Sequence, residues 1–332
     1  MADGSDTKAG QRLLRRVILL SIFGGAGLWW CAYALSGYWW IADVLMSFSA
    51  YVGFVVCVGG CVGLVLWRSW RGVVVFVVSI SVGLMCASDR RLFPEKKGAA
   101  DRTYLEVVTM NLNMGNARVE ELFGMLSGVG GDVLVLVEPR WEVFAAIKGG
   151  RDSLVRYPYR SHRVREGDVT SPMVILSRWP LERDEGVDSR SGVSVVVGRS
   201  EAEGGPFRLV GVHAHSPRGG RRWALGNDVI RGLVIQLEIL GDQDGLPLLL
   251  AGDLNGGPMT YRDRMIRAEL GLRRHSALFD PKSTFPSNPS NLGVLIDDIW
   301  GSDEFLSGSW STIVIPGSDH RGVRAGLTMR AP

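Results

Sequence analysis

The residues from position 101 onward contain no cysteine, because the four cysteines of the chain stand at positions 31, 57, 61 and 86. This absence excludes a disulfide framework and a cysteine-ligated zinc site from residues 101–332. The same part also lacks excess positive charge: it holds 27 of the 37 Lys and Arg residues and 29 of the 34 Asp and Glu residues. A domain with a net charge of −2 argues against a general nucleic-acid binder.

The chain also lacks an internal repeat, a low-complexity stretch and a fixed glycine period, and 46% of its 332 residues are hydrophobic. These features exclude a disordered or collagen-like protein. The length predicts one or two domains, and residues 101–332 are numerous enough to bury a substantial core.

Charge is almost absent from three apolar runs near the start of the chain. Residues 17–35 and 72–88 contain no charged side chain, and residues 41–67 contain only Asp43. Because about 20 apolar residues cross a bilayer, the sequence predicts three transmembrane helices within residues 17–88. A cleaved signal peptide explains the first run less well, since two more apolar runs follow it. A buried helix of a soluble protein is the alternative for the short third run.

The basic residues of the short loops predict the orientation of these helices. Residues 1–16 carry four Lys or Arg residues and the turn at 68–71 carries two, whereas the turn at 36–38 carries none. By the positive-inside rule, residues 1–16 form a cytoplasmic tail and the part after residue 88 is extracytoplasmic. Four basic residues within 90–97 weigh against this orientation, but the other two segments favour it.

Residues 89–103 are typical of a linker, and residues 104–332 are predicted to form one domain of strands and helices. The predicted helices have apolar residues at spacings of three to four and span residues 117–127, 223–240 and 259–270. The predicted strands are rich in β-branched residues and span 104–110, 132–137, 173–178, 192–199, 207–213, 246–252, 294–300 and 310–315. Many strands with few helices favour an α/β sandwich, in which helices cover sheets.

Polar side chains stand at the ends of five of the predicted strands or close to them. One strand-terminal Asp or Asn is usually a turn cap. Five such ends in one domain instead indicate a common edge at which a ligand binds. The residues are Asn111, Glu138, His213, Asp253 with Asn255, and Asp297, to which Asp319 and His320 are added from GSDHRG.

These motifs, in this order, resemble the endonuclease/exonuclease/phosphatase family, the DNase I-like metal-dependent phosphohydrolases. The matching pieces are MNLN, LVEP, GVHAHSP, GDLN in place of the usual GDFN, an Ile-Asp pair and SDH, and they span about residues 104–328. The resemblance implies a four-layer α/β sandwich in which two sheets pack between helices. Here this sandwich would follow the three transmembrane helices.

The resemblance also implies hydrolysis of a phosphate ester with Mg²⁺, or with Mn²⁺ as the alternative ion. Glu138 is a hard oxygen ligand suited to Mg²⁺, and Asn111 would support the metal site. Asp319 would either bind the metal or orient His320.

The catalytic roles also follow from the resemblance. Asp253 and Asn255 would orient the attacking water and bind the phosphate. His320 would accept a proton from that water, and His213 would donate a hydrogen bond to the phosphoryl group. Asp297 would hold one of the two histidines.

Three positions leave alternatives open. His215 lies two residues after His213 and competes with it for the functional role, although the strand end favours His213. Arg178 matches a strand-end position of the family or only closes a salt bridge. Asp298 stands where the family commonly has His, and it would either bind metal or face solvent.

The membrane tether is the most informative feature for the substrate. Three spans would hold the domain at the outer face of the bilayer, where a lipid-linked phosphate or pyrophosphate of the cell envelope is the expected substrate. The bilayer is then a partner, and no protein partner is predicted. The layout is similar to small bacterial membrane proteins of the VanJ type, associated with teicoplanin resistance, and of the YafD type.

Two other functions compete with this hypothesis. A membrane-tethered nuclease should have a basic groove with stacking aromatic residues, and residues 221–223 (RRW) are the only small cluster of that kind. A non-catalytic binding module would have lost the metal-binding Glu or the last His, and both Glu138 and His320 are present.

Overall fold

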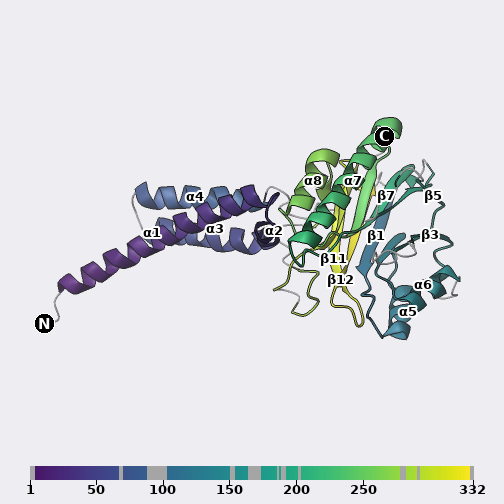
Figure 1. Ribbon diagram of the computed structural model, residues 1–332, viewed down its shortest axis with the longest axis horizontal. Coiled ribbons are helices and arrows are strands. Elements are labelled where there is room, and N and C mark those ends of the chain that lie inside the picture. The colour runs from purple at the N-terminus through teal and green to yellow at the C-terminus, as the bar shows by residue number, and fades with distance from the viewer. Residues whose placement is uncertain are drawn as a thin grey trace.

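The computed structural model of the protein describes residues 4–66, 70–87, 103–149, 154–163, 173–184, 187, 192–200, 203–276, 282–289 and 292–329. Helices from the first part of the chain project from one side of a domain built on two sheets (Figure 1). The linker predicted at 89–103 lies outside the described residues, apart from Thr103, which begins the first strand.

Four helices precede the sheets: α1 (Gly4–Leu35), α2 (Trp40–Met46), α3 (Ser49–Leu66) and α4 (Trp70–Ala87). Helix α1 begins at Gly4, so most of the predicted tail at 1–16 is the start of a long helix. The apolar residues 17–35 continue that helix without a break because they include neither proline nor a charged side chain.

The expected three spans are not found. Within the described part of the chain, one helix is long and apolar enough to cross a membrane, over Arg16–Leu35. The second expected span is broken, because Trp40–Met46 and Ser49–Val65 pass the same test only together and are bent by 66° at the break. The third contributes a shorter apolar helix, Gly72–Leu84. One apolar helix near the N-terminus is a feature that membrane anchors share with signal sequences.

The domain contains two six-stranded mixed sheets. The first has the strand order β11-β12-β1-β2-β4-β3 and the second has the order β5-β6-β7-β8-β10-β9. The strands of the first sheet are β1 (Thr103–Asn111), β2 (Val133–Val137), β3 (Tyr159–Arg163), β4 (Met173–Ser177), β11 (Phe305–Val314) and β12 (Arg321–Met329). Those of the second are β5 (Leu181–Arg183), β6 (Gly192–Val197), β7 (Phe207–His213), β8 (Leu248–Asp253), β9 (Arg273–Arg274) and β10 (Asp297–Gly301).

The two sheets pack face to face, and helices cover their outer faces. Alternate residues of β2, such as Val133 and Val135, pack in the core between the sheets with Val195 and Leu209. The intervening residues of β2 pack under α5 (Val119–Gly128) and α6 (Trp141–Lys148). Helices α7 (Gly220–Asp244) and α8 (Tyr261–Leu270) cover the second sheet. This helix–sheet–sheet–helix order agrees with the predicted α/β fold.

The parallel pairs bring strand ends from both sheets to one edge of the domain. In the first sheet β1 and β2 are parallel, and in the second β7 and β8 are parallel. Because the carboxyl ends of parallel strands meet at the same edge of a sheet, the residues that end these strands become neighbours. In the second sheet His213 is the register partner of Asp253, and Asp253 is also the partner of Asp297 on antiparallel β10.

Candidate active site

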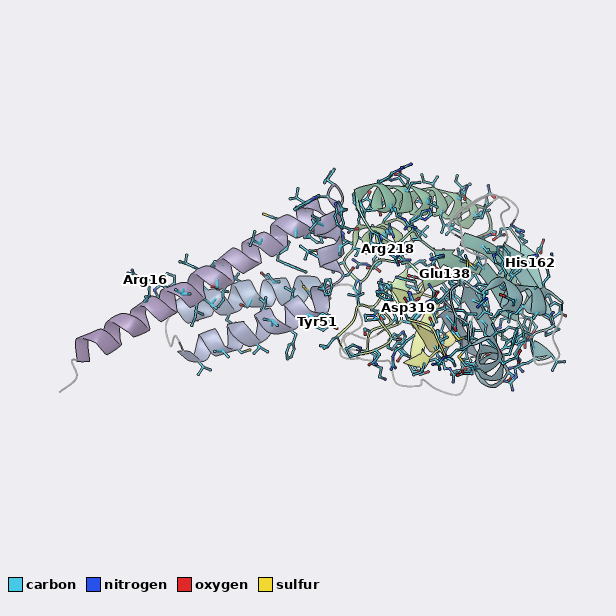
Figure 2. The ribbon with its side chains drawn as sticks, turned by 60° about the horizontal axis from the view of Figure 1, so that its bottom comes forward. Arg16, Tyr51, Glu138, His162, Arg218 and Asp319 are labelled. Carbon is cyan, nitrogen blue, oxygen red and sulfur yellow. The ribbon has the colours of Figure 1, made fainter. Side chains whose placement is uncertain are left out.

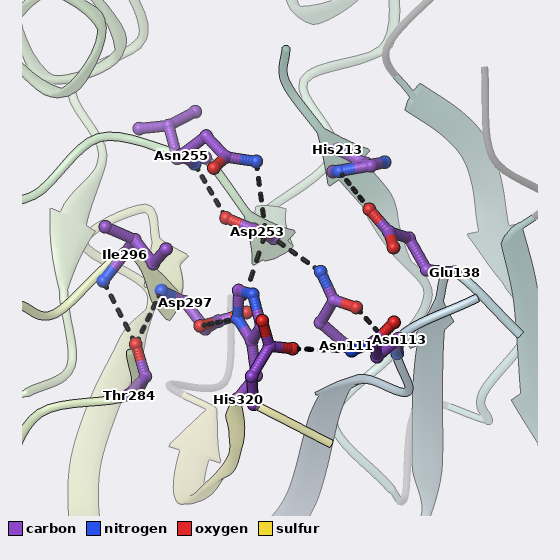
Figure 3. Close-up of polar contacts among 12 residues, drawn as sticks. Asn111, Asn113, Glu138, His213, Asp253, Asn255, Thr284, Ile296, Asp297 and His320 are labelled. Atoms are coloured by element: carbon purple, nitrogen blue, oxygen red, sulfur yellow. Dashed lines mark hydrogen bonds and ion pairs between the residues drawn. The ribbon is translucent and has the colours of Figure 1, made fainter. Parts of the chain in front are cut away.

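Asp253 lies at the centre of the polar edge (Figure 3). Its side chain is buried and accepts hydrogen bonds from Nδ2 of Asn111 at 2.9 Å, the backbone N–H of Asn255 at 2.7 Å and Nδ2 of Asn255 at 3.1 Å. Burial, together with the charge of Asp297, raises the pKa of Asp253 to about 6. The structure thus joins β1 of the first sheet to β8 of the second through one carboxylate.

His320 and Asp297 form a buried pair beside Asp253. Nδ1 of His320 lies 2.9 Å from Oδ2 of Asp297 and 3.9 Å from Oδ2 of Asp253. Burial lowers the pKa of His320, but the charges of the two carboxylates outweigh it and raise the pKa to about 10. A carboxylate can only accept a hydrogen bond, so Nδ1 carries a proton and Nε2 is the nitrogen that can exchange one.

Glu138 and His213 form a second pair, which spans the two sheets. Oε1 of Glu138 lies 3.1 Å from Nε2 of His213, and Oε2 accepts a hydrogen bond of 3.4 Å from the backbone N–H of Met114. Burial raises the pKa of Glu138, but the hydrogen bond and charge of His213 lower it by more, so the net pKa is lowered. The carboxylate is therefore ionised at neutral pH.

Asp319 joins the site through Asn113, which is not among the predicted site residues. Oδ1 of Asp319 accepts a hydrogen bond of 2.8 Å from Nδ2 of Asn113, whose backbone N–H donates to Oδ1 of Asn111 at 3.0 Å. The signal for Asn113 was present, because it is the last residue of the MNLN motif.

Two further residues, Thr284 and Phe285 of the TFPSNP segment (284–289), position the site. The hydroxyl of Thr284 accepts hydrogen bonds of 3.0 Å from the backbone N–H groups of Ile296 and Asp297, and so fixes the start of β10. The ring of Phe285 packs against that of His320, with 4.9 Å between the ring centroids.

The backbone is strained at this edge. Among the described residues, four non-glycine residues have positive φ, and three of them are Glu138 (51°), Asn113 (58°) and Asn255 (48°). Such conformations are uncommon outside glycine and cluster at functional sites. Gly252, at φ 148°, precedes Asp253, and any Cβ there would overlap the carbonyl oxygen of Val212.

The contacts of His213, His215 and Arg178 bear on two of the positions for which the sequence leaves alternatives open. His213 contacts Glu138, and the carbonyl of His215 accepts a hydrogen bond from Arg262. Arg178 forms an ion pair with Asp132 at 2.7 Å.

Asp298 neither faces solvent nor reaches the polar edge. Its carboxylate is buried and accepts hydrogen bonds from Arg274 at 3.1 Å, Ser276 at 2.6 Å and Trp310 at 3.0 Å. Neighbouring residues of a strand point to opposite faces of the sheet. Asp297 therefore reaches His320, whereas Asp298 closes a buried ion pair with Arg274.

The donor set of this edge suits a divalent cation. Asp253, Asp297 and His320 form a buried group whose ligand atoms lie within 4.8 Å of one another, which could hold a metal ion. Nδ1 of His320 is occupied by Asp297, however, and Mg²⁺ prefers oxygen ligands. The carboxylates of Glu138 and Asp319 add such oxygens.

Comparison with known proteins identifies relatives of this fold. The model of a family described as the Endonuclease/Exonuclease/phosphatase family matches residues 108–320. No curated protein matches the sequence. An endonuclease/exonuclease/phosphatase family protein from Bacteroides thetaiotaomicron is similar in structure, with a TM-score of 0.53, 16% identity and coverage of 70% of this chain and 100% of that one.

Two other solved structures show the same fold at low identity. The human Nocturnin catalytic domain with bound sulfate has a TM-score of 0.52 and 13% identity over 69% of this chain and 98% of its own. A variant of the 3′ phosphatase NExo from Neisseria, bound to a product DNA hairpin, has a TM-score of 0.51 and 16% identity. The match covers 67% of this chain and 98% of that one.

Proposed function

The chain belongs to the endonuclease/exonuclease/phosphatase family, and from this premise we propose that it is a membrane-anchored, Mg²⁺-dependent phosphohydrolase of the cell envelope. Members of this family are metal-dependent phosphoester hydrolases. One observation carries the proposal: the Glu138–His213 and Asp297–His320 pairs lie on either side of Asp253 at one edge of the two sheets.

In this proposal Glu138, Asn111 and Asp319 hold the cation. All three offer oxygen atoms, and Glu138 is ionised at neutral pH because its pKa is lowered. The cation would neutralise charge on the phosphoryl oxygens and acidify a bound water.

The other side chains would orient the water and move its proton. Asp253 and Asn255 are fixed to each other by two hydrogen bonds and orient the attacking water. His320 exchanges a proton through Nε2 while Asp297 holds Nδ1. His213, at the opposite side of Asp253, donates a hydrogen bond to the phosphoryl group.

The proposed substrate is a lipid-linked phosphate or pyrophosphate. In support, Arg16–Leu35 is apolar over 20 residues, which is the length of a membrane anchor. The basic residues before position 17 favour a cytoplasmic N-terminus and a catalytic domain outside the cytoplasm. A role in glycopeptide resistance would follow if the lipid is a cell-wall intermediate.

The nuclease alternative has less support from the described residues. Sequence-independent binding of single strands uses stacking on exposed aromatic rings. Trp223 of the RRW cluster is buried, and its indole N–H donates to Asp43 at 2.7 Å. This ring is therefore not available to a base.

The full chain in lipid nanodiscs tests the function. Undecaprenyl pyrophosphate, a phospholipid and plasmid DNA are each offered with Mg²⁺, with Mn²⁺ or with EDTA. We expect phosphate release from a lipid substrate that Mg²⁺ supports and EDTA abolishes. Glu138→Gln should lower the rate by about 10²-fold or more. The matched control is Glu142→Gln, at an exposed carboxylate four residues later that pairs only with Arg140 among the described residues.

Two outcomes would contradict the proposal. Cleavage of DNA with every lipid phosphate left intact would replace it by the nuclease. Equal rates for Glu138→Gln and Glu142→Gln would remove Glu138 from the metal site.

A further inference from the structure

Helix α2 buries its single carboxylate, Asp43, together with Ala42 and Met46 and exposes an apolar stripe. The stripe formed by Ile41, Leu45 and, just after the helix end, Phe48 is apolar and exposed by 39%, 45% and 40%. An exposed apolar stripe on a helix marks a surface that contacts another apolar phase.

The buried face of α2 is attached to the catalytic domain. The carboxylate of Asp43 accepts hydrogen bonds from the indole N–H of Trp223 at 2.7 Å and from the backbone N–H of Tyr261 at 2.6 Å. Trp40 packs against Gly220, where an added Cβ would lie 3.2 Å from its ring. The first turns of α7 and α8 are thus attached to α2, and its orientation relative to the domain is determined.

Helix α2 and helix α3 point in clearly different directions. Helix α2 is bent by 66° from α3 at the break between them. If α3 enters a bilayer, α2 therefore lies across its surface. The exposed residues that precede α2, Tyr38 and Trp39, are of the type enriched where a membrane meets water.

Two loops next to the candidate active site contact the helices at the end that faces the domain. The backbone N–H of Gly257, four residues after Asp253, donates to the hydroxyl of Ser47 at 3.1 Å. In the second loop, the carbonyl of Gly293 accepts a hydrogen bond of 2.6 Å from the hydroxyl of Tyr51. Figure 2 shows Tyr51 where the helices meet the domain.

The second of these loops links the helices to the site itself. It carries Phe285, which packs on His320, and Leu292, which is exposed. Figure 2 shows Asp319 and Glu138 nearer to the helices than His162 is. Two loops next to the candidate active site therefore contact the start of α3 and the residues just before it.

The charge next to α2 is positive. Three arginines are exposed here: Arg218 lies in the loop between β7 and α7, and Arg221 and Arg222 lie in the first turn of α7. None of the three forms an ion pair with another residue that the structure describes. Exposed arginines complement the anionic headgroups of a membrane.

We propose that the exposed stripe of α2, with Leu292 and these three arginines, is a docking face that rests on an anionic phospholipid bilayer. The catalytic edge then opens at the headgroup layer of the membrane that anchors the chain. The enzyme takes its phosphate ester from that layer and not from solution. This inference rests on the proposed membrane anchoring and names the location of the substrate for the same site.

Spin labelling tests the docking face independently of activity. The four native cysteines are replaced by alanine in the full chain, single cysteines are introduced as Leu45→Cys, Leu292→Cys and Ile239→Cys, and each is spin-labelled in anionic nanodiscs. The matched control, Ile239, is an apolar residue of α7 exposed by 54% and lies about 28 Å along that helix from Gly220. Depth is read from the competition between oxygen and a water-soluble nickel chelate.

The expected result is a label at position 45 about 5–10 Å below the phosphate level, a label at 292 at that level, and a fully aqueous label at 239. Equal accessibility of the nickel chelate to positions 45 and 239 would overturn the docking face. Because no turnover is measured, that result leaves the proposed reaction standing. Conversely, deep labels in a chain that hydrolyses no lipid would reject the reaction alone.

A second measurement does not depend on cysteine replacement. Hydrogen–deuterium exchange of the unmodified chain is compared between anionic and zwitterionic nanodiscs. Peptides covering 214–223 and 285–294 should exchange severalfold more slowly on the anionic discs. Residues 154–163 are the control, since His162 lies on the far side of the domain from the helices (Figure 2). Unchanged exchange in both test peptides would contradict the charge complementarity of the face.

Discussion

Replacement of Asp43 tests how the helices are fixed to the catalytic domain. The carboxylate accepts one hydrogen bond from Trp223 and one from the backbone of Tyr261, at 2.7 and 2.6 Å. A hydrogen bond to a charged group contributes about 1.5–3 kcal/mol, and removal of the acceptor leaves both donors buried and unsatisfied. We therefore expect Asp43→Ala to lower the free energy of unfolding by about 3–5 kcal/mol.

The assay is thermal unfolding of the full chain in detergent micelles. For a domain of this size the loss corresponds to a decrease in Tm on the order of 10 °C. Asp43→Asn keeps one oxygen acceptor and should cost about half as much. The matched control is Asp228→Ala, which removes an exposed carboxylate 2.7 Å from Arg231 and should cost at most about 0.5 kcal/mol.

The comparison with Asp228 decides the result. If Asp43→Ala lowers Tm no more than Asp228→Ala does, the helices are not held to α7 and α8 through this carboxylate. The geometry argued for the docking face would then lose its basis.

Two further changes test the catalytic edge. Asp297→Asn removes the carboxylate that holds Nδ1 of His320 at 2.9 Å, so the tautomer and orientation of the ring are no longer set and turnover should fall by about 10²–10⁴-fold with unchanged circular dichroism. A loss of less than threefold would mean that Asp297 does not orient the histidine. Gly252→Ala introduces a Cβ that overlaps the carbonyl of Val212 and should destabilise the chain by more than about 3 kcal/mol. Its control, Gly232→Ala on α7, meets no atom within 4 Å and should stabilise by about 0.5–1 kcal/mol; equal unfolding midpoints for the two variants would refute the argument.

The fold class could be predicted from the sequence because its signals are local. Apolar, β-branched runs such as VLVLV of β2 pack on both faces, and this pattern is visible in the letters. Helix α6 and strands β3, β5, β9 and β12 were not predicted. Strand β12 (RGVRAGLTM) carries two arginines and two glycines, so its pattern is weak by itself, and it forms because β1 and β11 pair with it on both sides.

The predicted second membrane span is broken in the structure at a place where contacts distant in sequence hold the backbone. The apolar letters of 41–67 predict one continuous helix, but the chain bends after Met46. At the bend Ser47 accepts a hydrogen bond from Gly257, and Ser49 donates to the carbonyl of Pro258 at 3.3 Å. These partners lie more than 200 positions away, so no window of sequence contains the reason for the break.

The sequence by itself determined which chemical groups stand at the strand ends, because strand alternation and turn chemistry act over a few neighbouring residues. Only the tertiary structure decided which groups meet. Asp253 contacts Asn111 across 142 positions of the chain, whereas Asp298, adjacent to Asp297, faces another layer. Distances between such residues depend on how the two sheets and the helices pack against one another. That packing is made of contacts between residues far apart in the chain.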